Sequence, residues 1–321
     1  MRFRFDARTS RGSMRVKDTY IVHISGSEGH GRGECALFRG LSAEDVPDYE
    51  SVLADACRDP EAALRHPFSS IRFGFETAFA DYFGGGRNVW TDTPWSRGLE
   101  GIAINGLIWM GDKPTMLRRI AEKLDAGFRV LKLKIGGIAF DDEVDLLRHI
   151  RSEYAPSDLE IRLDANGSFP VELALDRLNI LSDYSIHSLE QPIAAGQARA
   201  MSRICALSPI PIALDEELIG MRTDVEMAAL LDEIRPSYII LKPSLCGGFE
   251  RSDSWIAHAR ERGIGWWATS ALESDIGLNA IAQWVAAKKP SVPQGLGTGQ
   301  LYENNIPNGL ELRGNRLWRK V

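Results

Sequence analysis

The chain has 321 residues and a formal net charge of −6 at neutral pH. Its length suits one large domain with a smaller companion, and its composition is ordinary for a globular protein. The acidic total argues against nucleic acid as a partner, because binding phosphates requires a basic surface. The four cysteines form no CxxC pair, which argues against a zinc or disulfide framework. No signal-peptide pattern and no run of about eighteen apolar residues occurs, so we expect a cytoplasmic protein with no membrane partner.

The first 98 residues have a mixed pattern that differs from the rest of the chain. In chain order they predict a short strand, a glycine-rich loop, two helices and a closing glycine break, at 21–24, 26–33, 46–57, 70–83 and 84–86. The glycine-rich loop lacks the Lys-Ser/Thr ending of a phosphate-binding loop, so we interpret it as a mobile lid. We therefore predict an α+β capping domain over 1–98, completed by about 301–321.

Residues 99–300 alternate short apolar strands with amphipathic helical segments. Eight strands are predicted, at 101–109, 129–135, 160–166, 187–192, 211–216, 238–243, 265–270 and 294–299. Seven helical segments fit between them, among them 114–126, 141–154 and 170–182. This alternation predicts parallel pairing in a closed barrel. Since little helix follows the last strand, the predicted fold is α/β, a (βα)₇β TIM-like barrel with an α+β N-terminal capping domain.

Two lysines alternate with leucines in the second predicted barrel strand. Because successive side chains point to opposite faces, Leu131 and Leu133 share one face while Lys132 and Lys134 share the other. The leucine face packs on the helices, so both lysines are expected inside the barrel. Two buried ammonium groups need anionic partners. The alternative is an edge strand with a solvated lysine face.

The next three strands each place a carboxylate near their carboxyl ends. These residues are Asp164, Glu190 and Asp215, one strand–helix unit apart. The carboxyl ends of barrel strands form the face that carries active sites. Three carboxylates without histidine or cysteine favour a hard cation such as Mg²⁺, for which Mn²⁺ could substitute. Three unrelated capping acids are the alternative.

The following strand adds a third lysine, Lys242. Strand alternation turns it inward, so we expect it to face Lys132 and Lys134 across the site. A metal bound to a substrate carboxylate would stabilise the charge formed when the neighbouring proton is removed. A lysine is the expected base. The sequence therefore predicts an enzyme that acts on a small-molecule carboxylate.

These residues resemble the muconate-lactonising subgroup of the enolase superfamily in five motifs, Lys132-x-Lys134, Asp164-Ala-Asn-Gly, Glu190-Gln-Pro, Asp215-Glu216 and Lys242-Pro. Within that subgroup the chain resembles the o-succinylbenzoate synthase family in its short length and in the segments 33–42, 104–111, 270–274 and 295–299. The resemblance implies a hydro-lyase of menaquinone biosynthesis. Its reaction is the Mg²⁺-dependent dehydration of 2-succinyl-6-hydroxy-2,4-cyclohexadiene-1-carboxylate to o-succinylbenzoate.

The resemblance also implies roles for individual residues. Lys134 would remove the proton beside the ring carboxylate, Lys132 would stabilise the enediolate, and Lys242 would be a cationic stabiliser on the opposite face. The metal ligands would be Asp164, Glu190 and Asp215. Three neighbours would orient the ligands or lysines, namely Arg162, Asn166 and Glu216. The substrate-binding candidates are Ser270, Gly297, Phe38 and Arg39.

Other functions remain open at this point. An N-acylamino acid racemase or a dipeptide epimerase would use the same opposed lysines, although Gly297-Thr298-Gly299 replaces the Asp-x-Asp of the dipeptide epimerases. A non-catalytic anion-binding barrel and a Schiff-base aldolase using Lys242 are more distant alternatives. The sequence leaves the oligomeric state open, including a homo-oligomer.

Overall fold

A computed structural model describes residues 1–9, 12–27 and 29–321. Its largest sheet has seven parallel strands in the order β12-β11-β10-β9-β8-β7-β6. The strands are β6 (Gly106–Ile108), β7 (Val130–Lys134), β8 (Glu160–Asp164), β9 (Ile186–Glu190), β10 (Ile212–Leu214), β11 (Tyr238–Leu241) and β12 (Gly265–Ala268). Each strand pairs with its sequence neighbour, as expected where a helix returns the chain to the next parallel strand.

The segment around residues 294–295 occupies the place of the eighth strand. Gln294 forms a parallel bridge with Ile104, and Gly295 forms one with Thr269 just beyond β12. The segment thus bridges the two edges of the curled sheet. The predicted (βα)₇β barrel is confirmed.

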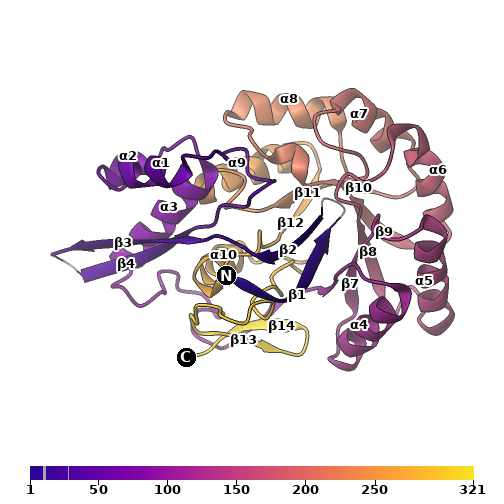
Figure 1. The fold of residues 1–321 in the computed structure, drawn as a ribbon, viewed down its shortest axis with the longest axis horizontal. Helices are drawn as coiled ribbons and strands as arrows, with labels where there is room; N and C mark the ends of the chain where they lie inside the picture. Colours follow the sequence, from indigo (N-terminus) through magenta and orange to yellow (C-terminus); the bar gives the residue numbers. More distant parts are fainter. Residues whose placement is uncertain (10–11, 28) are drawn as a thin grey trace.

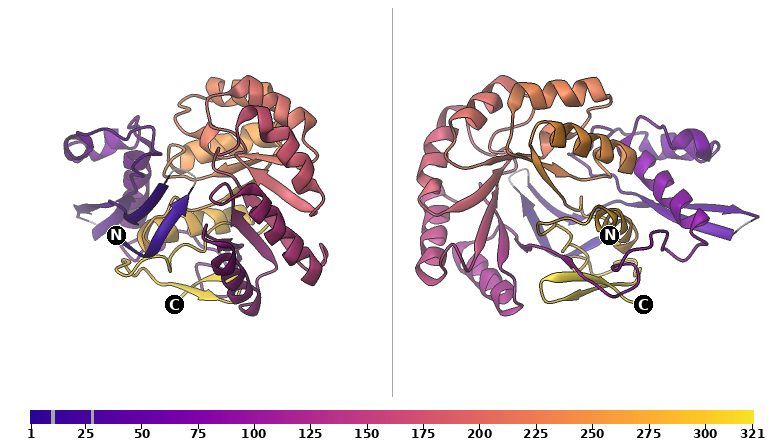
Figure 2. Two further views of the ribbon diagram at one scale, coloured as in Figure 1. Left: turned by 45° about the vertical axis from the view of Figure 1, so that its right-hand side comes forward. Right: turned by 180° about the vertical axis from the view of Figure 1, so that it is seen from behind.

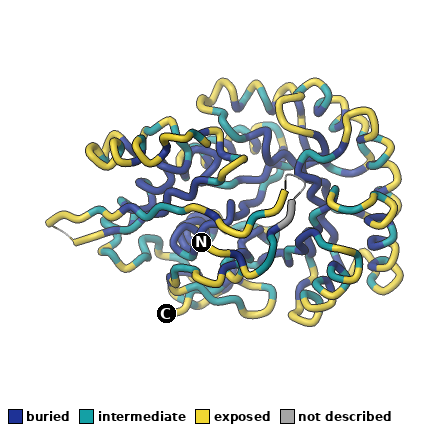
Figure 3. The backbone as a smooth tube through the Cα atoms, in the orientation of Figure 1, coloured by how far each residue is buried: buried dark blue, intermediate teal, exposed yellow. Residues whose placement is uncertain are grey.

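Seven helices follow the strands and cover the outside of the barrel. They are α4 (Lys113–Asp125), α5 (Phe140–Glu153), α6 (Val171–Ser182), α7 (Ala198–Leu207), α8 (Asp224–Ile234), α9 (Gly248–Glu261) and α10 (Asp275–Lys288). Local sequence determines where α8 begins, because Thr223 and Glu226 form a reciprocal capping box there. Helices α4 to α8 form an arc around the strands (Figures 1 and 2). Their outer faces are exposed whereas the strands are buried (Figure 3).

The first predicted barrel strand, 101–109, is wrong as a single strand. Its start forms β5 (Ile102–Ala103), which pairs antiparallel with β14 (Arg316–Arg319) and not with the barrel. Strand β14 in turn pairs with β13 (Leu310–Arg313). Only β6 joins the barrel sheet. The C-terminal hairpin therefore pairs with the first part of the predicted strand.

Among its described residues, the N-terminal part contains two antiparallel strand pairs and three helices. The elements are β1 (Arg2–Thr9), β2 (Gly12–Val16), β3 (Tyr20–Gly26), β4 (Gly29–Cys35), α1 (Tyr49–Ala56), α2 (Pro60–Ala63) and α3 (Ser69–Phe83). The β1–β2 hairpin lies at the centre of the view in Figure 1, between the barrel helices and the β3–β4 hairpin. Phe3 of β1 forms a bridge with Tyr302. The division into 1–98 with 301–321 and 99–300 stays a prediction.

The glycine-rich loop predicted at 26–33 is wrong for the residues that the structure describes, which exclude residue 28. Residues 29–33 belong to β4, and its glycines allow that strand to pack closely on α3. A Cβ on Gly33 would lie 1.8 Å from the Gly74 carbonyl oxygen, and one on Gly31 would lie 2.2 Å from the Ala78 carbonyl oxygen. Gly31 and Gly33 therefore serve strand–helix packing, and the interpretation of this segment as a lid stays a prediction.

A buried carboxylate ties β4 to the barrel. Glu34 accepts hydrogen bonds from the backbone N–H and hydroxyl of Ser274 and from the backbone N–H of Gly277, at the start of α10. A carboxylate at this position also complements the positive end of the helix dipole. Thr19 donates a further hydrogen bond at 2.6 Å. In the part of the chain that the structure describes, no helix is long and apolar enough to cross a membrane.

Candidate active site

The carboxyl ends of β7, β8 and β9 place the predicted residues at one level of the barrel. Lys134, Asp164 and Glu190 each end their strand, and the register pairs Lys134 with Asp164 and Asp164 with Glu190. Strand alternation keeps Leu133 fully buried on the opposite face, at 0% exposure. Parallel strands in register are therefore what bring these side chains together.

Lys132 is buried between two carboxylates. Its Nζ donates to both carboxylate oxygens of Glu190 at 2.7 and 2.6 Å and lies 2.8 Å from Asp164 Oδ2. Burial alone would lower the pKa of Lys132, but the charges of Asp164 and Glu190 outweigh it and raise that pKa. Lys132 is therefore held as a cation.

The second lysine of β7 makes different contacts. Lys134 Nζ donates to Asp164 Oδ2 at 2.9 Å and to Asn166 Oδ1 at 2.7 Å. Burial would raise the pKa of Asp164, yet the charges of Lys132 and Lys134 lower it below its usual range. The amine of Lys134 lies 5.7 Å from the centre of the Trp109 ring.

Lys242 enters the site from the other side of the barrel. It directly follows β11, and its amine donates to Asp215 Oδ2, which directly follows β10. Burial would lower the pKa of Lys242, but the charges of Asp215 and Glu216 outweigh it and raise that pKa. The structure thus brings the predicted lysines and carboxylates together.

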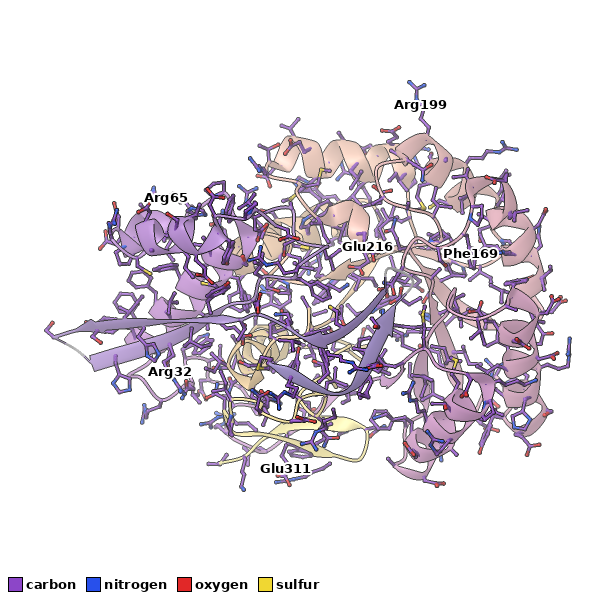
Figure 4. All side chains as sticks on the ribbon, viewed as in Figure 1. Arg32, Arg65, Phe169, Arg199, Glu216 and Glu311 are labelled. Atoms are coloured by element: carbon purple, nitrogen blue, oxygen red, sulfur yellow. The ribbon has the colours of Figure 1, made fainter. Side chains whose placement is uncertain are left out.

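The three predicted orienting residues occupy two levels. Asn166 contacts Lys134 through Oδ1 and donates through Nδ2 to Glu216 at 3.1 Å, so both lie in the site. In Figure 4 the label of Glu216, which is buried, lies near the middle of the view, whereas Arg199 projects from the upper rim. Arg162 lies deeper, where it donates to Glu160 and Pro293 and stacks 4.5 Å from the Trp267 ring centre. Arg162 therefore supports the barrel interior and does not orient the lysines directly.

The donor set suits a hard dication. In the described residues, no three acidic, histidine or cysteine side chains are already arranged around a metal position, because the carboxylates contact lysines. Burial and the nearby charges of Asp164 and Asp215 raise the pKa of Glu190 well above its usual value. The carboxylates of Asp164, Glu190 and Asp215 are thus crowded together in a buried place. A bound cation would relieve this crowding through oxygen ligands alone.

A cavity of about 60 Å³ adjoins these lysines. Three of the predicted substrate-binding residues line it, namely Phe38, Ser270 and Gly297. Arg39 does not line it, because its guanidinium is paired with Asp45 at 2.7 Å and donates to the Val46 carbonyl.

Further cavity residues were not predicted as site residues. Asn105, Leu107 and Trp109 line the cavity from the first barrel segment, and Thr298 lines it from the last. The spacing of two between the first three is the signal that could have found them, because it is the period of a strand with one inward face.

The loop after β7 is held by a buried acid of α5. Glu143 accepts backbone hydrogen bonds from Gly136 at 2.5 Å and from Gly137 at 3.3 Å. It is only 3% exposed. This contact fixes the chain two residues beyond Lys134.

Comparison with known proteins agrees with this geometry. The family described as enolase C-terminal domain-like matches residues 115–317. An o-succinylbenzoate synthase from Desulfotalea psychrophila is 45% identical over 98% of this chain and 95% of its own length. The chain belongs to the o-succinylbenzoate synthase family of the enolase superfamily. The resemblance stated above is confirmed, and the chain is an enolase-superfamily enzyme.

Solved structures have the same fold as this chain. The crystal structure of MenC from Desulfotalea psychrophila has a TM-score of 0.84 at 44% identity, with 95% of each chain covered. A dipeptide epimerase from Enterococcus faecalis, solved with Mg and the dipeptide L-Leu-L-Tyr, has a TM-score of 0.82 at 20% identity, with 100% of this chain and 94% of the epimerase covered. The epimerase shares the fold of the o-succinylbenzoate synthase family.

Proposed function

We propose that this protein is an o-succinylbenzoate synthase of menaquinone biosynthesis. It would dehydrate 2-succinyl-6-hydroxy-2,4-cyclohexadiene-1-carboxylate, removing the proton beside the ring carboxylate and the 6-hydroxyl group as water. The observation that carries the proposal is the meeting of three lysines and three strand-end carboxylates beside one cavity. The 45% identity to a synthase supports the choice of reaction.

Asp164, Glu190 and Asp215 would hold Mg²⁺. The Mg in the Enterococcus faecalis epimerase structure supports the choice of metal. When bound, the cation would supply positive charge against the negative charge that develops on the substrate carboxylate. Its binding would compete with the ammonium groups that now contact these carboxylates.

Lys134 would be the base. Its amine faces the cavity at the end of β7 and is oriented by Asn166 and Asp164. It would take the proton and then return it to the departing hydroxyl, so that one group performs both transfers. Asn166 is itself fixed by its bond to Glu216, which keeps the amine in place.

Lys132 and Lys242 would be cations throughout. Two carboxylates keep Lys132 protonated, and it would stabilise the charge that forms on the substrate. Lys242 lines the same cavity from another strand and would face the opposite side of the ring. The positive charge over the ring would stabilise electron density as it spreads.

N-acylamino acid racemisation is the second candidate. Two lysines from different strands line one cavity, and a racemase needs a proton donor and acceptor on opposite faces.

The test is to mix purified protein and Mg²⁺ with the diene and to follow the loss of its absorbance. A parallel sample holds N-succinyl amino acids in D₂O and is read for exchange of the α-proton. Rapid, chelator-sensitive diene loss would support the synthase. Exchange without diene loss would refute it in favour of racemisation.

A further inference from the structure

Three side chains that line the cavity beside the lysines each carry a buried polar atom with no hydrogen-bond partner among the described residues. Their unpartnered atoms are Asn105 Oδ1, Trp109 Nε1 and Thr298 Oγ1. The side chains are 3%, 5% and 4% exposed, so bulk water does not satisfy them. A buried polar atom without a partner costs free energy, and three beside one cavity indicate a missing polar ligand group.

The chain holds these three residues in place by other contacts. The Asn105 backbone N–H donates to the Gln294 carbonyl, which fixes the first and last barrel segments together. Phe5 of β1 packs edge-on against Trp109, with ring centres 5.8 Å apart. The Thr298 carbonyl accepts the backbone N–H of Leu301. The three polar groups are thus set in a rigid wall.

The chemistry of the wall selects an oxygen-bearing group. An indole N–H can only donate and a threonine hydroxyl can donate, so Trp109 and Thr298 call for an acceptor. The free atom of Asn105 is its amide oxygen, which accepts, and turning the amide by half a turn brings its N–H2 donor to the same place. The neighbouring charges are the ammonium groups of Lys134 and Lys242, which favour an anion or a carbonyl oxygen. Apolar Leu107 and Leu272 complete the lining and would cover a short carbon chain.

We propose that Asn105, Trp109 and Thr298 form the binding wall for a second oxygen-bearing arm of the substrate. This arm lies apart from the carboxylate beside which the proton is removed. The inference rests on the proposed function for the identity of the arm, which is the succinyl group with its ketone and carboxylate. These residues determine specificity, because they distinguish a substrate with the arm from one without it.

The test compares two ligands in the presence of Mg²⁺. o-Succinylbenzoate carries the arm and benzoate lacks it, and isothermal titration calorimetry gives both dissociation constants. Thr298→Val removes one donor with little change of shape, whereas Trp109→Phe removes the indole N–H together with part of the ring. Each is expected to weaken o-succinylbenzoate binding by about tenfold or more, with benzoate binding unchanged. Thr298→Ser keeps the hydroxyl and is expected to retain the affinity.

Matched controls come from the same chain. Thr77 and Trp255 are also buried, at 1% and 0% exposure, with unpartnered Oγ1 and Nε1 atoms, but they do not line the cavity. Thr77→Val and Trp255→Phe are expected to leave both dissociation constants unchanged.

Two results would overturn the inference. One is unchanged o-succinylbenzoate affinity in both cavity variants, and the other is an equal loss for benzoate. Absence of diene turnover by the wild-type protein would instead overturn the proposed function alone, since the binding comparison needs no turnover.

Discussion

The acid that holds the loop after β7 makes stability depend on pH. Burial raises the pKa of Glu143 to about 7, although the backbone N–H groups of Gly136 and Gly137 oppose the rise. In the unfolded chain the carboxyl would titrate near its ordinary value of 4.5. Between these two values the folded protein binds a proton that the unfolded chain has released. Stability from this group is therefore lost as the pH rises from about 4.5 to about 7.

Replacing the acid by Glu143→Gln removes this dependence. The amide oxygen still accepts the loop hydrogen bonds, but the side chain no longer ionises. A shift from 4.5 to about 7 corresponds to about 3 kcal/mol. We expect the free energy of unfolding of the variant, relative to the wild type, to rise by about this amount between pH 4.5 and pH 8.

Urea unfolding at several pH values measures the difference directly. Glu153→Gln is the control, because Glu153 is exposed and lies on the same helix, α5. Taking the difference from the wild type cancels the other groups that titrate in this range. A Glu143→Gln difference that stays constant with pH would refute the reasoning.

Three further outcomes are expected. Lys134→Ala should lower turnover by more than about 100-fold with an unchanged circular dichroism spectrum, and substantial residual turnover at saturating Mg²⁺ would remove Lys134 as the base. Asp215→Asn should weaken Mg²⁺ binding in a calorimetric titration, and unchanged affinity would exclude it from the ligand set. Gly33→Ala should destabilise the protein by about 1–3 kcal/mol in urea, because its Cβ would lie 1.8 Å from the Gly74 carbonyl oxygen. An unchanged unfolding midpoint would contradict that packing argument.

The barrel and the lysine–carboxylate cluster could be predicted because they depend on local periodicity. Lys132 and Lys134 alternate with leucines, and the parallel register then brings the next strand ends beside them. The same alternation at Asn105, Leu107 and Trp109 could have predicted that these side chains line the cavity. They were missed because they carry no charge.

The errors arose where distant segments decide the pairing. Ile102 and Ala103 have a strand pattern, yet their partner is β14, more than 200 residues later in the chain. Gly31 and Gly33 have a loop pattern because the sequence does not show the helix that packs on them. Arg39 was expected in the cavity, but the nearby Asp45 pairs with its guanidinium. In each case a tertiary partner outweighed the local pattern.

The hydrogen bonds that Glu34 accepts from the start of α10 affect how ligands enter and leave. Separating β4 from the barrel would break the charge-assisted bonds to Ser274 and Gly277 together, each contributing about 1.5–3 kcal/mol. A hinge at this joint would therefore open too rarely to carry each catalytic cycle. We expect release of product to depend on local rearrangement at the cavity mouth, near Phe38 and Leu272, while β4 and α10 move as one body.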